Sequence, residues 1–585
     1  MADTMEEKVV MTPKCKTASS TTLVVERKAV EPEASDKIHV AGGDHTGIII
    51  NKENVYENGV TEPCHAQLEF CVYLVSATTG LHTREARALR FWFKPQVLPD
   101  ERFHEAQAFF RELVSPQDFP KDYVGFIKKI IKLMQNKYHQ LKLLEIELRQ
   151  EESGPPPPES NGVLTSKSII YNYSNGCMYN TTYIDDSILN HTAVISEQKV
   201  LDMIENAYPN PMALDDFVSA GKWSKAEVRD ALESLEEKGL TRAMSEGIYV
   251  RQHSVDTQVV KQMPTLCSSR QPSIAVITAL YCEKQAVDAM MDNQETYVRY
   301  TTVGESNVYT LGTIGAHRVV TTKLPSVGRT REAMTAAGNT TTRLLGIFQK
   351  VEYVFLVGVG GGVPHYTDYS RHVRLGDVVV STPAPDLPDK SVYVFCEKAE
   401  RNGKGGWDFE VKPYKPQSYL LQEIAVRLTK SQAPWNSYVS EGLDRLRSVP
   451  GRWEPPEGFA DRLCMEVGDG AYIEVSHPAP QGDQIDNISP GLRVHCAPVA
   501  GGRGAACAGE ARAAFAALHR AKAYDCELDA VLDSVNGNRK DCFVSIRGIS
   551  DYKDGTRGKE WQPHAALAAA AVMKSIVAAM DPPTD

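Results

Sequence analysis

The sequence predicts an α/β protein whose C-terminal half contains a mostly parallel sheet with helices on both faces. From about residue 270 onward, strand-like apolar runs alternate with helix-like segments, the runs being SIAVITAL, RVVTTKL, VEYVFLVGVGGGV, GDVVVSTP and CFVSIRGISDY. Strands that are buried on both faces are continuously apolar, and such strands occur in parallel sheets covered by helices. The chain has 585 residues, which is too long for a single core at roughly 100 to 200 residues per domain.

The composition excludes several other classes of protein. Apolar residues make up 42% of the chain and charged residues 24%, which is the globular range and not that of a disordered or collagen-like chain. Lys and Arg number 64 against 75 Asp and Glu, a net charge of −11. Because phosphate backbones attract basic proteins, nucleic acid is not the expected partner.

The cysteines and the hydropathy pattern indicate a cytoplasmic protein. The 12 cysteines form no CxxC pair, so neither a disulfide framework nor a metal site is expected. The N-terminus lacks an apolar signal core, and no apolar run reaches the roughly 18 residues that a membrane span needs. We expect no membrane association, no bound metal and no cofactor.

The N-terminal third has weaker patterns than the rest of the chain. Residues 1–60 are polar and predict a flexible arm with one short strand at 46–51. Residues 61–152 contain two amphipathic helical patterns and predict an α-rich domain. Residues 153–194 predict a linker, because the proline run of Gly154–Pro158 is incompatible with a helix.

A segment within this linker has an unusual composition. Residues Ser168 to Ile184 are rich in Asn, Tyr and Ser, which is typical of chains that stack as cross-β. The segment resembles the RIP homotypic interaction motif of amyloid-forming immune adaptors. An ordinary β-hairpin explains the same composition, and the sequence leaves both interpretations open.

Residues 195–255 resemble a winged-helix domain, with three helices followed by a two-stranded hairpin. Ser224 and Glu227 have the spacing of a capping box, and Gly239 ends the third helix. That helix would face DNA, yet its charges from Lys225 to Lys238 sum to −2. A negative face repels phosphate, so we expect this domain to contact protein or to have a purely structural role, and not to bind nucleic acid.

Five ordered motifs in residues 270–582 resemble the nucleoside phosphorylase and nucleosidase superfamily. They are Ile274–Leu280 followed by Glu283, the glycine run Val357–Pro364, Arg374–Ser381, Glu527–Asp529 and Arg547–Asp551. The most similar branch is attached to immune-type receptors and ends in a KEWQPxAALAAAA helix, here Lys559–Ala571. The resemblance implies the mostly parallel sheet already expected from the strand pattern.

The resemblance also implies roles for individual residues in breaking a purine N-glycosidic bond. Asp551 corresponds to the general acid that protonates the leaving purine, although Asp also favours a helix N-cap. Asp529 corresponds to the carboxylate that grips the ribose hydroxyls, with Glu527 able to share that work and Leu528 packing near the ribose. Glu283 corresponds to the residue that aims water, although a helix first turn also favours a carboxylate.

The glycine run distinguishes hydrolysis from phosphorolysis. In the family, this loop lines the substrate; phosphorolytic members and several hydrolytic ones carry Ser in it, and bacterial phosphorylases add an Arg a few residues earlier. Here Leu356 and Val359 stand at those places, beside Gly360, so no phosphate donor is present. The resemblance therefore implies a hydrolase, with a phosphorolytic enzyme as an alternative.

The family branch includes enzymes that cleave ATP to adenine and ribose triphosphate, and a triphosphate needs cations. Arg329 and Arg331 follow a predicted strand, and Arg557 and Lys559 lie in the closing loop. We expect Arg329 and Arg331 to contact the substrate's 5′ end; solvated surface charge is the competing explanation.

Together these patterns predict an intracellular purine N-ribosyl hydrolase, possessing N-terminal domains that regulate it or assemble it into a homo-oligomer. Its partners would be a purine nucleoside or nucleotide and other proteins. The alternative from another class is a catalytically silent purine-binding scaffold.

Overall fold

The computed structural model divides the chain into two compact units, which are described separately. It describes residues 7–17, 20–29, 38–40, 49–51, 63–75, 82–115, 123–150, 167–168, 171–174, 177–180, 195–252, 257–264, 270–300, 306–325, 331–403, 406–431, 434–456, 461–468, 471–480, 491–502, 509–525, 528–553 and 559–583. The first unit comprises residues 1–190, 365–372 and 462–487, and the second comprises the remainder.

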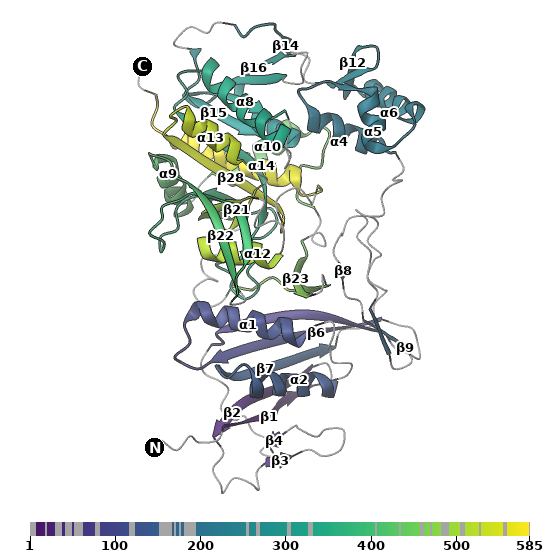
Figure 1. Cartoon of the computed structure of the whole chain (residues 1–585), viewed down its shortest axis with the longest axis vertical. Helices are drawn as coiled ribbons and strands as arrows, with labels where there is room; N and C mark the ends of the chain where they lie inside the picture. Colours follow the sequence, from purple (N-terminus) through teal and green to yellow (C-terminus); the bar gives the residue numbers. More distant parts are fainter. Residues whose placement is uncertain are drawn as a thin grey trace. The chain divides into compact units, whose positions relative to one another are not determined.

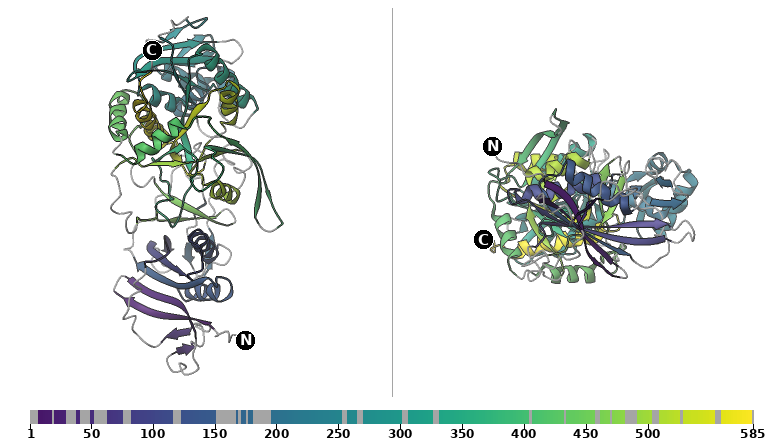
Figure 2. Two further views of the ribbon diagram at one scale, coloured as in Figure 1. Left: turned by 90° about the vertical axis from the view of Figure 1, so that its left-hand side faces the viewer. Right: turned by 90° about the horizontal axis from the view of Figure 1, so that it is seen from below.

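A ten-stranded sheet forms the first unit, in the order β23-β24-β5-β6-β7-β2-β1-β4-β3, with β8 beside β24. Two helices pack on it, as Figure 1 and the turned view of Figure 2 show. The elements are β1 Glu7–Lys16, β2 Ser20–Ala29, β3 Ile38–Val40, β4 Ile49–Asn51, β5 Ala66–Val75, β6 His82–Phe93, α1 Pro99–Leu113, α2 Tyr123–Asn136, β7 Leu141–Gln150, β8 Lys167–Ser168, β9 Tyr171–Ser174, β10 Cys177–Asn180, β23 Leu463–Gly468 and β24 Ala471–Val475.

This sheet corrects two sequence expectations. The flexible arm expected over 1–60 is wrong for β1 and β2, which pair antiparallel from Glu7↔Ala29 to Lys16↔Thr21. The α-rich domain expected over 61–152 is instead an antiparallel sheet with two helices. The two helices were correctly expected, but the long strands β6 and β7 were missed because their alternating charged residues resemble solvated surface, as Arg90 and Glu145 illustrate.

Two strands of this sheet, β23 and β24, come from a distant part of the sequence. β23 and β24 pair antiparallel with each other, and Val475 of β24 lies opposite Phe70 of β5.

Within the Asn- and Tyr-rich segment, β9 and β10 pair as a hairpin, Tyr171 lying opposite Asn180. Of the two interpretations that the composition allows, the structure therefore shows the ordinary β-hairpin within a single chain.

The second unit contains a 13-stranded sheet with the main order β14-β16-β17-β18-β15-β19-β27-β26-β21-β22; outside this order, β28 pairs with β19, β20 with β28, and β25 with β20. Its strands are β14 Gln258–Val259, β15 Ile274–Thr278, β16 Asp292–Arg299, β17 Asn307–Ile314, β18 His317–Lys323, β19 Tyr353–Gly362, β20 Val378–Ser381, β21 Tyr393–Arg401, β22 Trp407–Tyr414, β25 Val494–Ala497, β26 Val499–Gly501, β27 Ala523–Tyr524 and β28 Cys542–Asp551. The central strands β18, β15, β19 and β28 are parallel, whereas β16, β17 and β22 pair antiparallel at the margins. The sheet is therefore mixed, with its parallel part at the centre.

Helices cover both faces of this sheet. Successive residues of the central strands point to opposite sides, so each strand packs against helices on both faces. Val276 of β15 packs in a cluster with the alanines of α14, whereas its neighbour Ile277 packs in a cluster with Leu344 and Val531. The helices are α7 Tyr281–Asp288, α8 Arg331–Ile347, α9 Leu420–Thr429, α10 Trp435–Leu446, α12 Gly509–His519, α13 Asp529–Gly537 and α14 Gln562–Ala578.

A winged-helix arrangement precedes the sheet in the same unit. Its elements are α4 Glu197–Ala207, β11 Met212–Ala213, α5 Leu214–Gly221, α6 Lys225–Glu237, β12 Thr241–Ser245 and β13 Ile248–Arg251. The expected capping box is present, since Ser224 Oγ accepts from the Glu227 N–H at 3.2 Å and Glu227 Oε2 accepts from the Ser224 N–H at 3.0 Å. Gly239 ends α6 with φ +70°, which favours glycine.

We expect the full-length protein not to bind duplex DNA in a salt-dependent manner. The charged side chains of α6 and its C-cap are exposed, namely Lys225, Glu227, Arg229, Asp230, Glu233, Glu236, Glu237 and Lys238. Fluorescence anisotropy with a labelled duplex at low and moderate salt measures this. Changing Glu233 and Glu237 to Lys should create weak binding, and tight wild-type binding that falls steeply with salt would contradict the expectation.

Candidate active site at the strand ends

Glu283 lies buried at the carboxyl ends of the central parallel strands. Its Oε2 accepts hydrogen bonds from the backbone N–H groups of Ala279 and Leu280 at 2.7 and 2.8 Å. Its Oε1 accepts from the backbone N–H of Val359 at 2.8 Å. The surface position that the helix alternative implies is excluded, since Glu283 is 1% exposed. The hydrogen bonds of this carboxylate thus connect the start of α7 with the middle of β19.

The glycine run allows this carboxylate to approach β19. A Cβ on Gly358 would lie 2.3 Å from Oε1 of Glu283, so no larger residue fits there without displacing it. The side chain of Val359 is 3% exposed and packs in the apolar core, while Gly360 pairs with Ile549 of β28. Val359 therefore supplies a backbone N–H to Glu283 and no side-chain donor to a ligand.

Asp551 and Asp529 lie at the ends of a strand and of a helix, close to the carboxyl ends of the central strands. Asp551 is the last residue of β28, is paired in register with Gly361, and accepts at Oδ1 from the Lys553 N–H at 2.7 Å. Asp529 is the first residue of α13, and burial raises the pKa of its carboxyl group. Leu528, before it, is buried in the core beneath α13.

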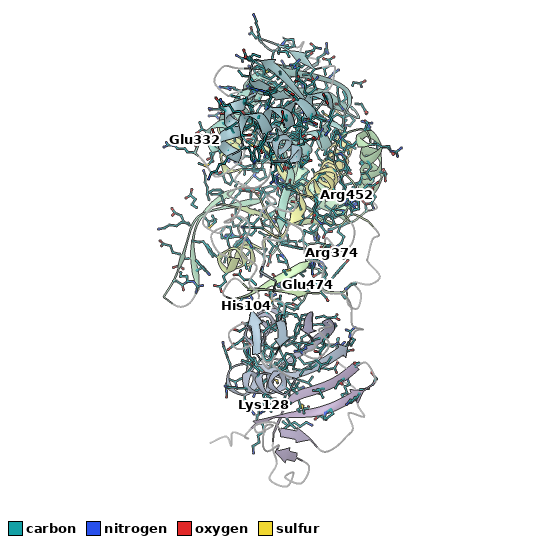
Figure 3. All side chains as sticks on the ribbon, turned by 90° about the vertical axis from the view of Figure 1, so that its right-hand side faces the viewer. His104, Lys128, Glu332, Arg374, Arg452 and Glu474 are labelled. Carbon is teal, nitrogen blue, oxygen red and sulfur yellow. The ribbon has the colours of Figure 1, made fainter. Side chains whose placement is uncertain are left out.

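Two of the residues expected in the site, Glu527 and Arg329, lie outside the described part of the chain. Arg331 is exposed at the first position of α8, next to Glu332, which is labelled in Figure 3. Lys559 is also exposed and contacts Asp202 of α4 at 2.5 Å. The expected role of Arg331 at a substrate tail stays a prediction.

The sequence analysis missed a second buried charged group beside Glu283. Arg547, 1% exposed on β28, donates from Nε to Ser545 Oγ at 3.1 Å and lies 3.4 Å from Asp525 Oδ2. The hydroxyl of Tyr393 donates to Asp525 Oδ1 at 2.6 Å. Arg547 belongs to one of the five motifs, and Asp525 precedes another motif residue, Glu527, by two positions. Their burial depends on pairing between distant parts of the sequence, which no local pattern encodes.

The charges of this group leave an excess of acid. Burial raises the pKa of Asp525 to about 6, against the lowering effect of Arg547, and burial also raises the pKa of Glu283. Glu283 and Asp525 both interact with the one buried guanidinium of Arg547, and the nearby carboxylate of Asp529 raises the pKa of Asp525 further. Within the described residues, Asp525 Oδ2, Asp529 Oδ1 and one terminal nitrogen of Arg547 are buried without a hydrogen-bond partner. Such unpaired atoms suit a polar ligand.

The winged-helix elements contact this region through a buried lysine. Lys323, the last residue of β18, is 0% exposed and donates from Nζ to the carbonyl oxygens of Asn206 and Tyr208 at 3.0 and 2.8 Å. Burial lowers its pKa to about 7, with Glu283 and Glu205 raising it.

Aromatic and ionic contacts strengthen the same junction. Arg251 of β13 lies 4.8 Å from the ring of Tyr281 and 2.8 Å from Glu205 Oε1. Tyr281 belongs to α7, two residues before Glu283. The winged-helix elements are therefore packed against the helix that carries the central carboxylate.

Sequence comparison identifies the winged helix independently. The family model described as "Winged helix-turn-helix domain" matches residues 185–253. A curated protein from Hyaloscypha variabilis, named nucleotide-binding leucine-rich repeat (NLR)-like protein, is 27% identical over 316 residues. This match covers 53% of the present chain but spans only 29% of the length of that relative.

Solved structures with low similarity cover about half of the chain. A 5′-methylthioadenosine/S-adenosylhomocysteine nucleosidase from Neisseria meningitidis is 17% identical, covering 52% of this chain and 99% of its own, with a TM-score of 0.33. The futalosine hydrolase of Helicobacter pylori is 14% identical, with coverages of 52% and 97% and a TM-score of 0.31. A putative nucleosidase of the first kind from Borrelia burgdorferi, bound to adenine, is 15% identical, with coverages of 52% and 100% and a TM-score of 0.33.

Two structural features are absent from the described residues. Among them, no helix has both the length and the apolar character of a membrane span. In the same residues, no cluster of three His, Cys, Asp or Glu side chains has the arrangement of a metal site.

Replacing Gly358 with Ala should destabilise the second unit. The added methyl group would overlap Glu283 and force its carboxylate away from three N–H groups, and overpacking of this kind costs about 1 to 3 kcal/mol of unfolding free energy. Gly403→Ala is the matched control, since nothing lies within 4 Å of its added methyl group. Equal unfolding free energies of the two variants in chemical denaturation would contradict this packing.

Asp525→Asn should change how stability depends on pH. Between the ordinary pKa of 3.8 and the folded value of about 6, the unfolded chain loses this proton while the folded protein keeps it. The contribution of Asp525 to wild-type stability therefore declines as pH rises through that window, by about 3 kcal/mol, and the Asn variant lacks this contribution.

Denaturation of the wild type and the Asp525→Asn variant at pH 4 and pH 7 measures this difference. Asp541→Asn, at an exposed position, is the control. A stability difference between wild type and Asp525→Asn that is independent of pH would contradict the raised pKa of Asp525.

Proposed function

We propose that the second unit hydrolyses the N-glycosidic bond of a purine nucleoside or nucleotide. The observation that carries this proposal is the buried acidic group at the strand ends, where Glu283 and Asp525 share the guanidinium of Arg547 and Asp529 lies close enough to raise the pKa of Asp525. Cleavage of this bond leaves an oxocarbenium-like ribose, and preorganised negative charge stabilises developing positive charge. Ligands of such sheets bind at the carboxyl ends of the strands, where these groups lie.

The positions of the acids support one assignment of roles. Glu283 accepts a proton from water, whose oxygen bonds to the anomeric carbon; its pKa, raised by burial, brings it closer to that of an efficient base. The bond between the anomeric carbon and the purine N9 breaks, and Asp551 donates a proton to N7 of the leaving base. Asp529, with an unpaired buried oxygen, binds the ribose hydroxyls.

Hydrolysis is proposed over phosphorolysis because the glycine strand offers no side-chain donor. Leu356 is 0% exposed and Val359 is 3% exposed, and both side chains pack in apolar clusters. The side chains of these two residues would give a phosphate co-substrate no hydrogen bond, so this part of the glycine strand could bind it only through backbone groups. Water needs only the nearby Glu283 carboxylate.

The finer part of the proposal concerns the substrate and the biological role. Arg331, exposed at the start of α8, and Arg329 are proposed to bind a 5′ phosphate chain, as in ATP. Similarity to a protein named NLR-like supports an immune-type effector whose N-terminal unit regulates or oligomerises the enzyme. Glu527 is proposed to assist Asp529.

The test is incubation of the purified chain with ATP, adenosine or methylthioadenosine, with and without phosphate, followed by chromatography. We expect free base and a sugar without phosphate at its anomeric carbon. Asp551→Asn should reduce base release by about 10²- to 10⁴-fold, whereas Asp541→Asn, exposed immediately before β28, should not.

Each other outcome assigns a different function. Ribose 1-phosphate or its 5′-substituted analogue as the main product would establish phosphorolysis. Wild-type turnover in a folded Asp551→Asn variant would remove Asp551 from the mechanism. Binding of adenosine without any base release would establish the silent scaffold.

A further inference from the structure

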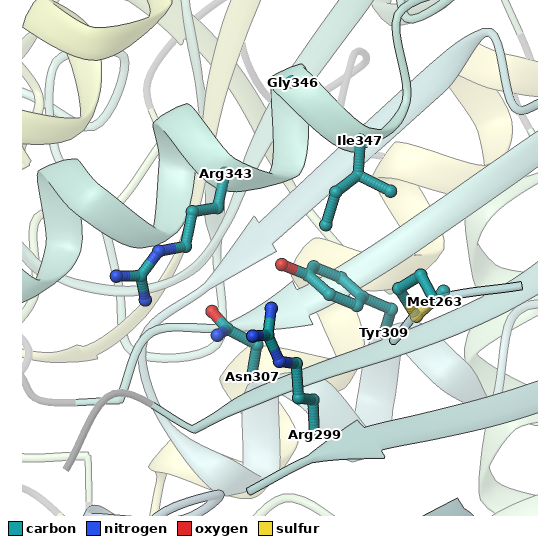
Figure 4. A pocket seen from close by; sticks show the side chains of 7 residues that line it. All are labelled: Met263, Arg299, Asn307, Tyr309, Arg343, Gly346 and Ile347. Carbon is teal, nitrogen blue, oxygen red and sulfur yellow. The ribbon is translucent and has the colours of Figure 1, made fainter. Parts of the chain in front are cut away.

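A second hollow lies in the same unit between the end of α8 and the strands β16 and β17 (Figure 4). Its volume is about 210 Å³, room for roughly seven waters at about 30 Å³ each. It is lined by Met263, Arg299, Asn307, Tyr309, Arg343, Gly346 and Ile347.

This pocket is separate from the residues assigned above to a substrate. Arg343 lies twelve positions after Arg331 on α8, which at about 1.5 Å per residue places the two Cα atoms about 18 Å apart along the helix axis. Tyr309 belongs to β17, which is separated from β15 by β18. None of the lining residues belongs to the acidic group around Glu283.

The lining is cationic on both sides. Arg299, the last residue of β16, is exposed, and Arg343, on the facing helix, is half-buried. The lining residues include no carboxylate. The C-terminal end of α8 opposes an anion with about half a negative charge, which the two guanidinium charges exceed. The described lining of the pocket therefore carries a net positive charge, which favours a negatively charged ligand.

Tyr309 provides a neutral donor at the same place. It is 1% exposed, and its ring is held edge-on against Phe348, with the centroids 5.6 Å apart. Its hydroxyl points into the pocket (Figure 4), and no described group forms a hydrogen bond with it. A buried hydroxyl without a partner is destabilising, so this atom is suited to binding a ligand oxygen.

The electrostatics of Tyr309 support this role. Burial raises the pKa of Tyr309 to about 12, while Arg343 and Arg299 both lower it. The hydroxyl therefore keeps its proton at neutral pH and acts as a donor. Both guanidinium groups act on this one oxygen, so their charges converge on the pocket.

We propose that this pocket binds a phosphomonoester, at a site independent of the strand-end centre. Guanidinium groups pair well with phosphate oxygens, and the tyrosine hydroxyl adds a third donor. Met263 and Ile347, the latter 36% exposed, supply apolar surface for the carbon part of the ester. Free phosphate shares the anionic chemistry but makes no use of that apolar surface.

The pocket lies on a helix that also supports the candidate active site. α8 packs against α13, where Ser534 Oγ donates to the carbonyl oxygen of Gly338 at 3.1 Å. α13 begins at Asp529. A ligand in the pocket would thus contact the helix that packs on the Asp529 helix, whether or not the proposed hydrolysis is correct.

Isothermal titration of the full-length protein with phenyl phosphate and with inorganic phosphate tests the site. The variants are Arg299→Gln, the double change Arg299→Gln with Arg343→Gln, and Tyr309→Phe. Arg318→Gln, exposed on β18 and outside the pocket, is the charge-matched control. Each lost charge-assisted hydrogen bond should weaken binding about tenfold or more.

We expect phenyl phosphate to bind more tightly than inorganic phosphate, with binding lost in the double variant and kept in Arg318→Gln. The exposed Arg299→Gln and the conservative Tyr309→Phe keep the test valid if the double variant does not fold. Equal affinity for both ligands would overturn the ester in favour of a free-phosphate site. Absence of binding, or equal weakening by Arg318→Gln, would overturn the site itself. Base release by the same protein is measured separately, so failure of the hydrolase proposal does not affect this result.

Discussion

The buried carboxylate of Glu283 is the constraint on which the candidate site depends. It accepts three backbone N–H groups from two separate elements, the start of α7 and the middle of β19. An ionisable group at 1% exposure is unfavourable unless it is hydrogen-bonded and its charge is compensated. Those requirements explain why position 358 lacks a side chain and why Arg547 is buried in the adjacent strand. The geometry of the glycine run follows from the carboxylate that it surrounds.

Charge compensation around Glu283 extends into the winged-helix elements. Lys323 interacts electrostatically with Glu283 and donates its hydrogen bonds to the carbonyl oxygens at the end of α4. A buried ammonium group needs such acceptors, because desolvation lowers its pKa to about 7. Displacing α4 would leave Lys323 without two of its acceptors and would alter the charge facing Glu283. The winged helix thus contributes to the electrostatics of the candidate site as well as to packing.

The sequence predicted the parts of this structure that depend on local patterns. Strands β15, β19 and β28 are buried on both faces and are continuously apolar, and the helices α4 and α6 have clear stripes and caps. Strands such as β7, LKLLEIELRQ, alternate apolar and charged residues, and the charged residues form ion pairs across the sheet, as between Arg90 and Glu145. Residues at the strand ends were likewise predictable from motifs. The pairing of Asp525 with Arg547 and Tyr393 was not, because it joins three elements that are distant in sequence.

The pairing of strands that are distant in sequence also determines whether one unit can be removed from the chain without disrupting the other. β23 and β24 come from residues 463–475 but pair in the N-terminal sheet, and residues 365–372, which belong to the same unit, follow β19 after only two residues. Removing residues 1–190 would leave β24 without its neighbour β5 and would expose unpaired backbone groups on that strand, which promote aggregation. The chain that emerges from the glycine strand is therefore anchored in the N-terminal unit. The two units are topologically interwoven, so the second half of the sequence is not a separable module joined by a simple linker.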